Sequence, residues 1–239
     1  MTVANHVVVG EETLHLMSEM ETFNQWMFDS IRPYIGQRVL EAGAGIGNFT
    51  GRLVDRELVV ALELEADRVE RLRQRFADYP HVRAEVGDLA HSSLLQLAHY
   101  QFDTVICLNV LEHIEQHVEA LTHMHEVLAP GGRLLLLVPA HPALYSLLDT
   151  ELGHYRRYRE SELRALLEGV GFRIERRFYM NLFGVFGWWL NGRVLKRRLL
   201  PRGQLGVYER LAPVFRGIEE GLGRRWGLSV VFVGQKAQA

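Results

Sequence analysis

Three glycines that follow a carboxylate form the first group of residues suited to chemistry. Glu41 comes after a short apolar run at 38–40, and Gly43, Gly45 and Gly47 follow it at alternate positions. Glycine is required where a backbone turns sharply and lies against a ligand, because a Cβ would obstruct both. We therefore expect a strand that ends near Glu41, followed by a turn whose main chain touches a bound molecule.

A second acid stands where the sugar of a nucleoside would be bound. An apolar run at 58–64 contains Glu63 near its end, 18 residues beyond Gly45. An acid about 20 residues past such glycines can accept hydrogen bonds from both hydroxyls of a ribose. A phosphate would favour positive charge at the turn, whereas Glu41 favours a cationic or hydroxylated ligand. After the turn we expect a helix to start near Asn48.

The glycine pattern fails the dinucleotide fingerprint and resembles a different family. Counted from Gly43, the last position of G-x-G-x-x-G falls on Asn48. The pattern E-x-G-x-G-x-G, which begins at Glu41, resembles motif I of the class I methyltransferases that use S-adenosylmethionine (SAM). The resemblance implies SAM as the cofactor, with the glycine turn, Ala44 included, against its aminoacid end. It also implies that the ribose lies beside Glu63, and we add Leu64 to this cofactor site.

Two later segments continue the resemblance. Asp88 and Leu89 follow the expected strand 82–86, where members of the family hydrogen-bond the adenine amino group and flank its ring. Asn109-Val-Leu-Glu-His follows the expected strand 102–109 and resembles motif IV. There Asn109 would lie where the sulfonium meets the acceptor, and Val110 and Leu111 would pass beneath SAM.

We predict no metal site. Related O-methyltransferases of the ubiquinone type use Glu-x-x-Glu-His with a divalent cation, but Asn109 replaces the first Glu here. Asparagine is a neutral and weaker ligand. The histidines of the helix expected at 117–128, His117, His123 and His125, lack the i, i+4 spacing of a helical metal pair.

The segment after the fifth expected strand, 133–138, should meet the methyl acceptor. His141 and His154 are the candidate general bases. The candidate acceptor-binding residues are Tyr145, Tyr155, Arg156, Arg157 and Tyr158. Arginine binds carboxylate or phosphate in a bidentate manner, so these arginines could clamp an anionic acceptor. The alternative is a basic loop paired with Asp149, Glu151 and Glu160.

A long insertion separates the last two expected strands, 173–179 and 228–234. Residues 180–227 are too long for a hairpin loop, and we expect helices there. The aromatic and basic stretch 182–200 could lie in a membrane interface or bind a lipid-like acceptor. It could equally form a lid or a homodimer contact. The motifs G-H-Y-R-R-Y and G-W-W-L-N-G-R resemble bacterial methyltransferases found beside or fused to family-2 glycosyltransferases.

Composition bounds the chain to one domain of 239 residues. Residues 1–153 carry 10 Lys+Arg and 22 Asp+Glu, a net charge of −12, whereas residues 154–202 carry 12 and 4, a net of +8. The single Cys107, the lack of a visible signal peptide and the lack of an apolar run of about 20 residues predict a cytoplasmic protein. The basic segment 182–200 could in addition attach the protein to a membrane surface. We expect no nucleic-acid partner, because the arginines at 68–75 alternate with acids.

We therefore expect an α/β, doubly wound, Rossmann-like methyltransferase sheet of seven strands in the order 3-2-1-4-5-7-6. The single domain, 1–239, would comprise a helical cap at 1–35, a SAM-binding core at 36–179 and 228–239, and the insertion at 180–227. The expected activity is methyl transfer to an oxygen of a small or lipid-like acceptor. The rivals are a SAM-binding or membrane-surface partner of a glycosyltransferase system and a nicotinamide-dependent oxidoreductase.

Overall fold

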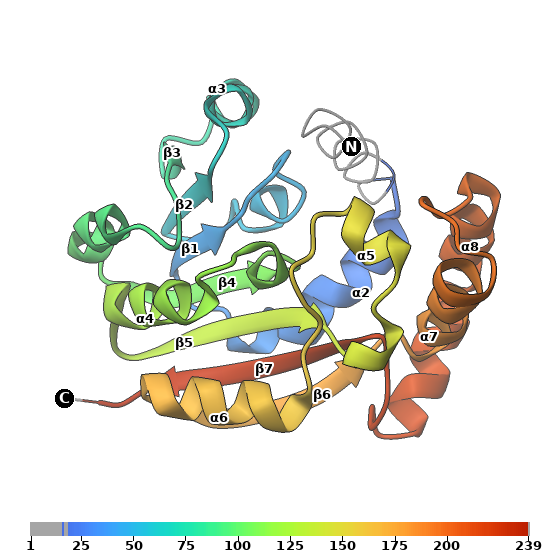
Figure 1. Ribbon diagram of the computed structural model, residues 1–239. Coiled ribbons are helices and arrows are strands. Elements are labelled where there is room, and N and C mark those ends of the chain that lie inside the picture. Colours follow the sequence, from blue (N-terminus) through green and yellow to red (C-terminus); the bar gives the residue numbers. More distant parts are fainter. Residues whose placement is uncertain (1–15, 17–18, 239) are drawn as a thin grey trace.

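A seven-stranded sheet forms the centre of the molecule (Figure 1). The computed structural model describes residue 16 and residues 19–238. The strand order is β3-β2-β1-β4-β5-β7-β6, as the sequence predicts. The strands are β1 (Arg38–Ala42), β2 (Leu58–Glu63), β3 (Val82–Val86), β4 (Phe102–Leu108), β5 (Leu128–Pro139), β6 (Phe172–Met180) and β7 (Ser229–Lys236). β1 to β5 are parallel, and β7 pairs antiparallel with both β5 and β6.

The central strands are apolar because helices cover both faces of the sheet. One face packs on α4 (His117–Val127), α6 (Glu160–Val170) and a 3-10 segment, Ser92–Tyr100. The other face packs on α2 (Glu21–Ile31) and α3 (Ala66–Arg75). Alternate residues of each strand therefore enter different cores. The carboxyl ends of β1 to β4 remain free of these layers, and the expected site residues lie there.

The helix expected to start near Asn48 is absent. Residues 45–49 form turns, followed by a 3-10 turn, Thr50–Arg52. The Thr50 hydroxyl donates a hydrogen bond to Glu41 Oε2 at 2.5 Å, and the Arg75 guanidinium donates one to the Ile46 carbonyl at 2.6 Å. These tertiary contacts fix the segment as a compact loop, and Leu53 is still fully buried below it.

The helix expected within 12–35 is shorter in the structure. Part of it, 12–15 with 17 and 18, lies outside the described residues. The remainder is α2 and a 3-10 turn, Arg32–Tyr34. Phe23, Met27 and Ile31 are buried on the sheet, as their spacing predicts.

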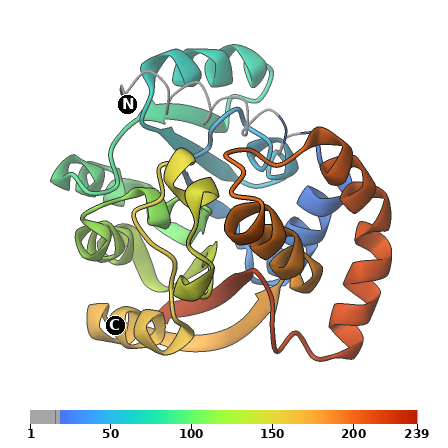
Figure 2. The ribbon, with the colours of Figure 1, turned by 45° about the vertical axis from the view of Figure 1, so that its right-hand side comes forward.

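The insertion contains α7 (Leu182–Trp188), a π-helical turn (Trp189–Val194) and α8 (Arg202–Gly221). Both ribbon views show α7 and α8 at one side of the sheet (Figures 1 and 2). Glu209 on α8 accepts hydrogen bonds from the Thr22 and Phe23 amides at the start of α2. Arg216 pairs with Asp29 at 2.7 Å. α8 is therefore fastened to α2 as well as to the loops that flank it.

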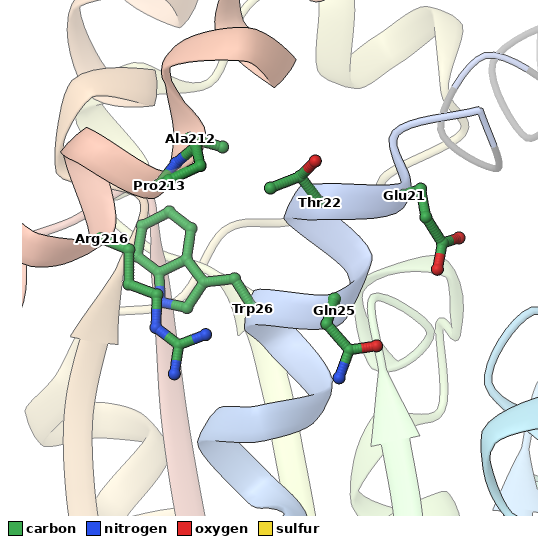
Figure 3. A pocket seen from close by; sticks show the side chains of 7 residues that line it. All are labelled: Glu21, Thr22, Gln25, Trp26, Ala212, Pro213 and Arg216. Atoms are coloured by element: carbon green, nitrogen blue, oxygen red, sulfur yellow. The ribbon is translucent and has the colours of Figure 1, made fainter.

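A cavity of about 330 Å³ lies between α2 and α8 (Figure 3). Its lining comprises Glu21, Thr22, Gln25, Trp26, Ala212, Pro213 and Arg216. The indole ring of Trp26 lies beside Arg216 and Pro213 in this view. Beside this cavity the two helices meet through the Arg216–Asp29 ion pair, the Glu209 contacts with the start of α2, and the Phe23–Tyr208 ring contact.

Candidate functional site

The glycine turn is held in a conformation that suits glycine. Gly43, Gly45 and Gly47 have φ values of +75°, +57° and +86°, in the left-handed region. A Cβ on Gly43 would lie 2.5 Å from Val110 Cγ2, and one on Gly47 would lie 2.8 Å from Leu72 Cδ2. The amides of Gly43 and Ala44 both donate to the Leu62 carbonyl. The turn therefore lies tightly between β2, α3 and the segment that follows β4.

Glu63 connects the second strand to this turn. Its Oε2 accepts a hydrogen bond from the Gly45 amide at 2.8 Å, and its Oε1 accepts one from the Leu64 amide at 3.0 Å. Arg68 lies 3.5 Å from Oε1. The carboxylate is nearly buried, yet it stands at the tip of β2, directly beside the glycine turn. The carboxylate therefore links the end of β2 to the backbone of the glycine turn.

Glu41 is a buried carboxyl one register position before the end of β1. It is paired with Ala61 of β2 and Ile106 of β4 in the sheet, and its side chain binds Thr50. Burial raises the pKa of Glu41 to about 7, although the hydrogen bonds from Thr50 lower it. A cationic ligand nearby would favour the ionised form.

The other expected cofactor residues are divided between surface and core. Leu64, Asp88 and Asn109 are exposed at the carboxyl ends of β2, β3 and β4. Leu89 and Leu111 are buried in the core. Asn109 has φ +53°, so the chain turns as it leaves β4, and Val110 then reaches the glycine turn. An exposed apolar side chain, an acid and an amide thus border the glycine turn at one edge of the sheet; Asn48 is half-buried in that turn.

Asp149 is the centre of a second polar cluster, on the expected acceptor side. It is fully buried in α5 (Leu147–Glu151). Its carboxylate lies 3.0 Å from His154 Nδ1 and accepts hydrogen bonds from Arg157 Nε at 2.6 Å and Trp188 Nε1 at 3.2 Å. Burial alone raises the pKa of Asp149, but the hydrogen bonds and charges of His154 and Arg157 outweigh it and lower the pKa. An ionised Asp149 accepts the Nδ1 proton of His154, which leaves Nε2 as the basic nitrogen.

Two of the expected acceptor-binding residues have internal partners instead. Arg157 is buried, binds Asp149 and the Ala140 carbonyl, and lies 4.6 Å over the Trp188 ring. Tyr158 is buried, and its hydroxyl contacts the Leu111 carbonyl and His117 Nδ1. For Arg157 the structure thus shows the paired arrangement that we gave as the alternative to an anion clamp.

The other three expected acceptor-binding residues, Tyr145, Tyr155 and Arg156, are closer to the surface. Tyr155 is exposed, and the Arg156 guanidinium lies 5.6 Å from its ring centroid. Arg156 Nη2 also donates to the Glu115 carbonyl. The Tyr145 hydroxyl donates to the His154 carbonyl at 2.6 Å. Arg156 is thus the arginine of the pair that remains near solvent.

His141 belongs to a different environment from His154. Its ring is stacked between Tyr179, at 5.5 Å, and Trp226, at 4.7 Å, and its Nε2 contacts the Gly227 carbonyl at 3.0 Å. Burial lowers the pKa of His141. These contacts tie β5 to the end of the insertion, so His154 is the better placed of the two candidate bases.

Sequence reasoning missed the importance of Glu112 and Asp149. Glu112 is buried, its Oε2 has no hydrogen-bond partner, and its Oε1 lies 4.0 Å from His154 Nε2. Burial raises its pKa to about 7. Donor atoms of Glu112, His113 and His154 lie within 4.8 Å of one another. The sequence did contain one signal for this cluster, because an acid, Asp149, stands five residues before His154. We considered Asp149 only as an ion-pair partner of the basic loop.

The comparisons with known proteins agree with this geometry. Residues 40–134 match the family model described as a methyltransferase domain. An uncharacterized methyltransferase of Mycobacterium tuberculosis is 31% identical over 119 residues, which cover 49% of this chain and 58% of the relative. In the first curated relatives that it matches, the aligned part covers at most 58% of their length.

Solved structures are similar to this chain in overall fold. A SAM-dependent methyltransferase from Mesorhizobium loti has a TM-score of 0.62 at 16% identity, covering 88% of this chain and 98% of that one. The N-methyltransferase NodS from Bradyrhizobium japonicum, in complex with S-adenosylhomocysteine, has a TM-score of 0.52 at 20% identity, covering 66% and 76%. Residues 40–134 thus match a methyltransferase domain in sequence, and the chain has the fold of the class I SAM-dependent methyltransferases.

Proposed function

We propose that this protein is a SAM-dependent methyltransferase. The observation that carries the proposal is the direct hydrogen bond between Glu63 at the tip of β2 and the Gly45 amide of the glycine turn. This contact sets a ribose-binding acid beside the backbone that would receive the aminoacid end of SAM. Leu64 and Asp88, both exposed nearby, would meet the adenine ring, and Asn109 would lie toward the methyl group.

We infer an oxygen of a small or lipid-like acceptor as the methyl-accepting atom. In such a transfer the acceptor oxygen attacks the methyl carbon in line with the departing sulfur, so positioning supplies much of the rate. The S–CH₃ bond breaks as the C–O bond forms, and the hydroxyl proton must leave. Asp149 holds His154 with Nε2 directed toward Glu112, and this nitrogen would take that proton.

Groups of the acceptor away from the methylated oxygen would contact the more accessible side chains near His154. Tyr145, Tyr155 and Arg156 surround the backbone of His154 and could orient an anionic group on the acceptor. Arg157 would act through Asp149, because it is buried against that carboxylate. The first part of the insertion closes this side, since Trp188 reaches Asp149 and Arg193 reaches the Ala143 carbonyl.

Titration calorimetry with SAM and with S-adenosylhomocysteine tests the cofactor site. We expect both to bind, and we expect Glu63→Gln to weaken binding by about 10- to 100-fold, as for the loss of a charged hydrogen bond. Glu65→Gln is the matched control, because Glu65 is exposed two residues further along. Absence of heat with either nucleoside on folded protein would refute the proposal.

Binding without turnover has a separate meaning. If SAM binds but no acceptor from a broad set of hydroxylated metabolites and lipids is methylated, the rival of a SAM-binding partner protein gains support. A change in nicotinamide absorbance would instead support the oxidoreductase.

A further inference from the structure

α8 carries an apolar surface that faces solvent. Its members, named here the α8 stripe, are Val207, Leu211, Val214, Ile218 and Leu222, and they are between 42% and 58% exposed. Their spacings of four, three, four and four residues place them along one side of the helix. Exposed apolar residues are ordinary when single, but a continuous row of five on one helix indicates an interaction surface.

The stripe is not the face that attaches α8 to the protein. Tyr208, Ala212, Phe215 and Glu219 lie on another side of the helix and are buried or half-buried. Tyr208 packs with the α2 core, and Phe215 stacks on Phe183 of α7 at 4.1 Å. The carboxylate of Glu219 binds the Asn181 and Leu182 amides. The internal packing of α8 is therefore complete without the stripe.

More exposed apolar side chains stand close by in the insertion. Phe186, Trp189 and Trp226 are 64%, 44% and 61% exposed. Of the sixteen large apolar side chains exposed in the described part of the chain, ten lie within 182–226. Exposed apolar side chains are therefore concentrated in the insertion, although the body of the protein also carries some. Figure 2 shows the helices of this insertion at the periphery of the molecule, on the side where α2 lies.

The charge of the same region is strongly positive. Between 182 and 208 there are five cationic residues and no acid, and the cations are Arg193, Lys196, Arg197, Arg198 and Arg202. All five are exposed. Over 182–226 the count is nine Lys+Arg against three Asp+Glu, a net of +6. Basic clusters beside an exposed apolar helix face are the composition that binds anionic lipid.

We propose that the α8 stripe and the adjoining basic segment dock onto an anionic bilayer surface. The charge selects this occupant over a second copy of the chain, because two copies would bring two regions of net +6 together. The stripe would enter the headgroup boundary, with Trp189 and Trp226 at its level and the cations against lipid phosphates. This inference does not depend on methyl transfer. The sequence suggested a membrane contact through 182–200, whereas the structure points to α8 as its apolar part.

The attachment would also orient the acceptor side. α7 joins the docking region to Asp149 through Trp188, and Arg193 reaches the loop after β5. A protein resting on α8 would therefore present the His154 loop near the bilayer. An acceptor that resides in the membrane could then reach that loop without crossing the solvent.

Vesicle co-sedimentation of the full chain tests the proposal. We expect binding to phosphatidylcholine vesicles that contain about 30% phosphatidylglycerol, little binding to pure phosphatidylcholine, and weakening between about 50 and 500 mM salt. The double variant Val214→Ser with Ile218→Ser should bind about tenfold more weakly or worse. Val86→Ser with Val118→Ser is the matched control, because these side chains are 52% and 42% exposed on the body of the protein.

A charge variant separates the two parts of the surface. Lys196→Glu with Arg210→Glu should lower affinity for the anionic vesicles by at least about tenfold and flatten the salt dependence. Thermal melting confirms that each variant is folded. Equal sedimentation of stripe and control variants would overturn the proposal, as would failure of the wild type to bind anionic vesicles. A concentration-dependent dimer abolished by the stripe variant would likewise overturn it and make this face a subunit contact.

Discussion

At the scale of single residues, Asp149 shows how one buried acid can organise a site. Its carboxylate receives contacts from α5 itself, from the loop containing His154 and Arg157, and from α7 of the insertion. Such an acid is tolerated in the interior because hydrogen-bonding groups contact its carboxylate from each of these segments. Its contact with His154 Nδ1 orients the imidazole ring, so that Nε2 lies on the side of Glu112.

Asp149→Asn is expected to reduce turnover by about 100-fold or more, since His154 loses the acceptor that orients it. Arg157 would also remain buried without its carboxylate, so the melting temperature should fall. Turnover under saturating SAM, compared with SAM affinity by calorimetry, checks this: affinity should be nearly unchanged. Glu162→Gln, in an exposed pair with Arg159, is the control. Normal turnover by the Asn variant would exclude His154 as the base.

Glu41 gives a stability prediction with a defined sign. Its pKa is raised to about 7 in the folded protein from an ordinary value of 4.5, so between these pH values the folded state keeps a proton that the unfolded chain has lost. The stability that this group contributes is complete below about pH 4.5 and is lost as the pH rises through about 7. Melting temperatures at about pH 5 and pH 8 should therefore differ less in Glu41→Gln than in the wild type. An equal or larger difference in the variant would contradict the raised pKa.

At the scale of elements, the site depends on a backbone turn that passes very close to neighbouring side chains. The glycine turn, the end of β4 and α3 approach one another so closely that a methyl group changes the contact. Gly43→Ala would set a Cβ 2.5 Å from Val110 Cγ2 at φ +75°. We expect a loss of about 1–3 kcal/mol in unfolding free energy, together with weaker SAM binding.

Gly169→Ala in α6 is the control for this substitution. Nothing lies within 4 Å of its would-be Cβ, so alanine should be neutral or stabilise the protein by up to about 1 kcal/mol. Urea unfolding of both variants measures the contrast. Equal stability of the two would show that the glycine turn is looser than its geometry indicates.

The sequence predicted the strands well because buried parallel strands are continuous apolar runs bounded by polar residues. β2 and β4 were expected at 58–64 and 102–109 and occur at Leu58–Glu63 and Phe102–Leu108. The helix near Asn48 was wrong because the Thr50 side chain bonds to Glu41, and no periodicity reveals that contact. The burial of Arg157 and Glu112 was equally invisible, since it depends on which of several charged neighbours meets Asp149.

At the scale of the whole molecule, three regions would have three different roles: the edge of the sheet with Glu41 and Glu63, the cluster around Asp149, and the insertion. The carboxyl ends of β1 to β4 would hold the cofactor, the loop after β5 would meet the acceptor, and the insertion would place the protein. Among the residues that the structure describes, no helix is long and apolar enough to cross a membrane.

Metal independence can be tested on the whole enzyme. We expect turnover to survive dialysis against a strong chelator unchanged, because Asn109 replaces a charged ligand and the proposed transfer needs only positioning and His154 as the base. Addition of Mg²⁺ or Zn²⁺ should not raise the rate. If activity is lost and one divalent ion restores it, Glu112, His113 and His154 become the site to examine, since their donor atoms are already close together.

The position of β7 has a consequence for how this chain is made. The strand latest in sequence lies between β5 and β6 and pairs with both. During synthesis, β6 and the whole insertion leave the ribosome before the partner that joins them to the sheet exists. Until β7 has been made, the apolar surface of β6 lacks the strand that joins it to the sheet, so the nascent chain is most exposed to misassociation between the synthesis of β6 and that of β7.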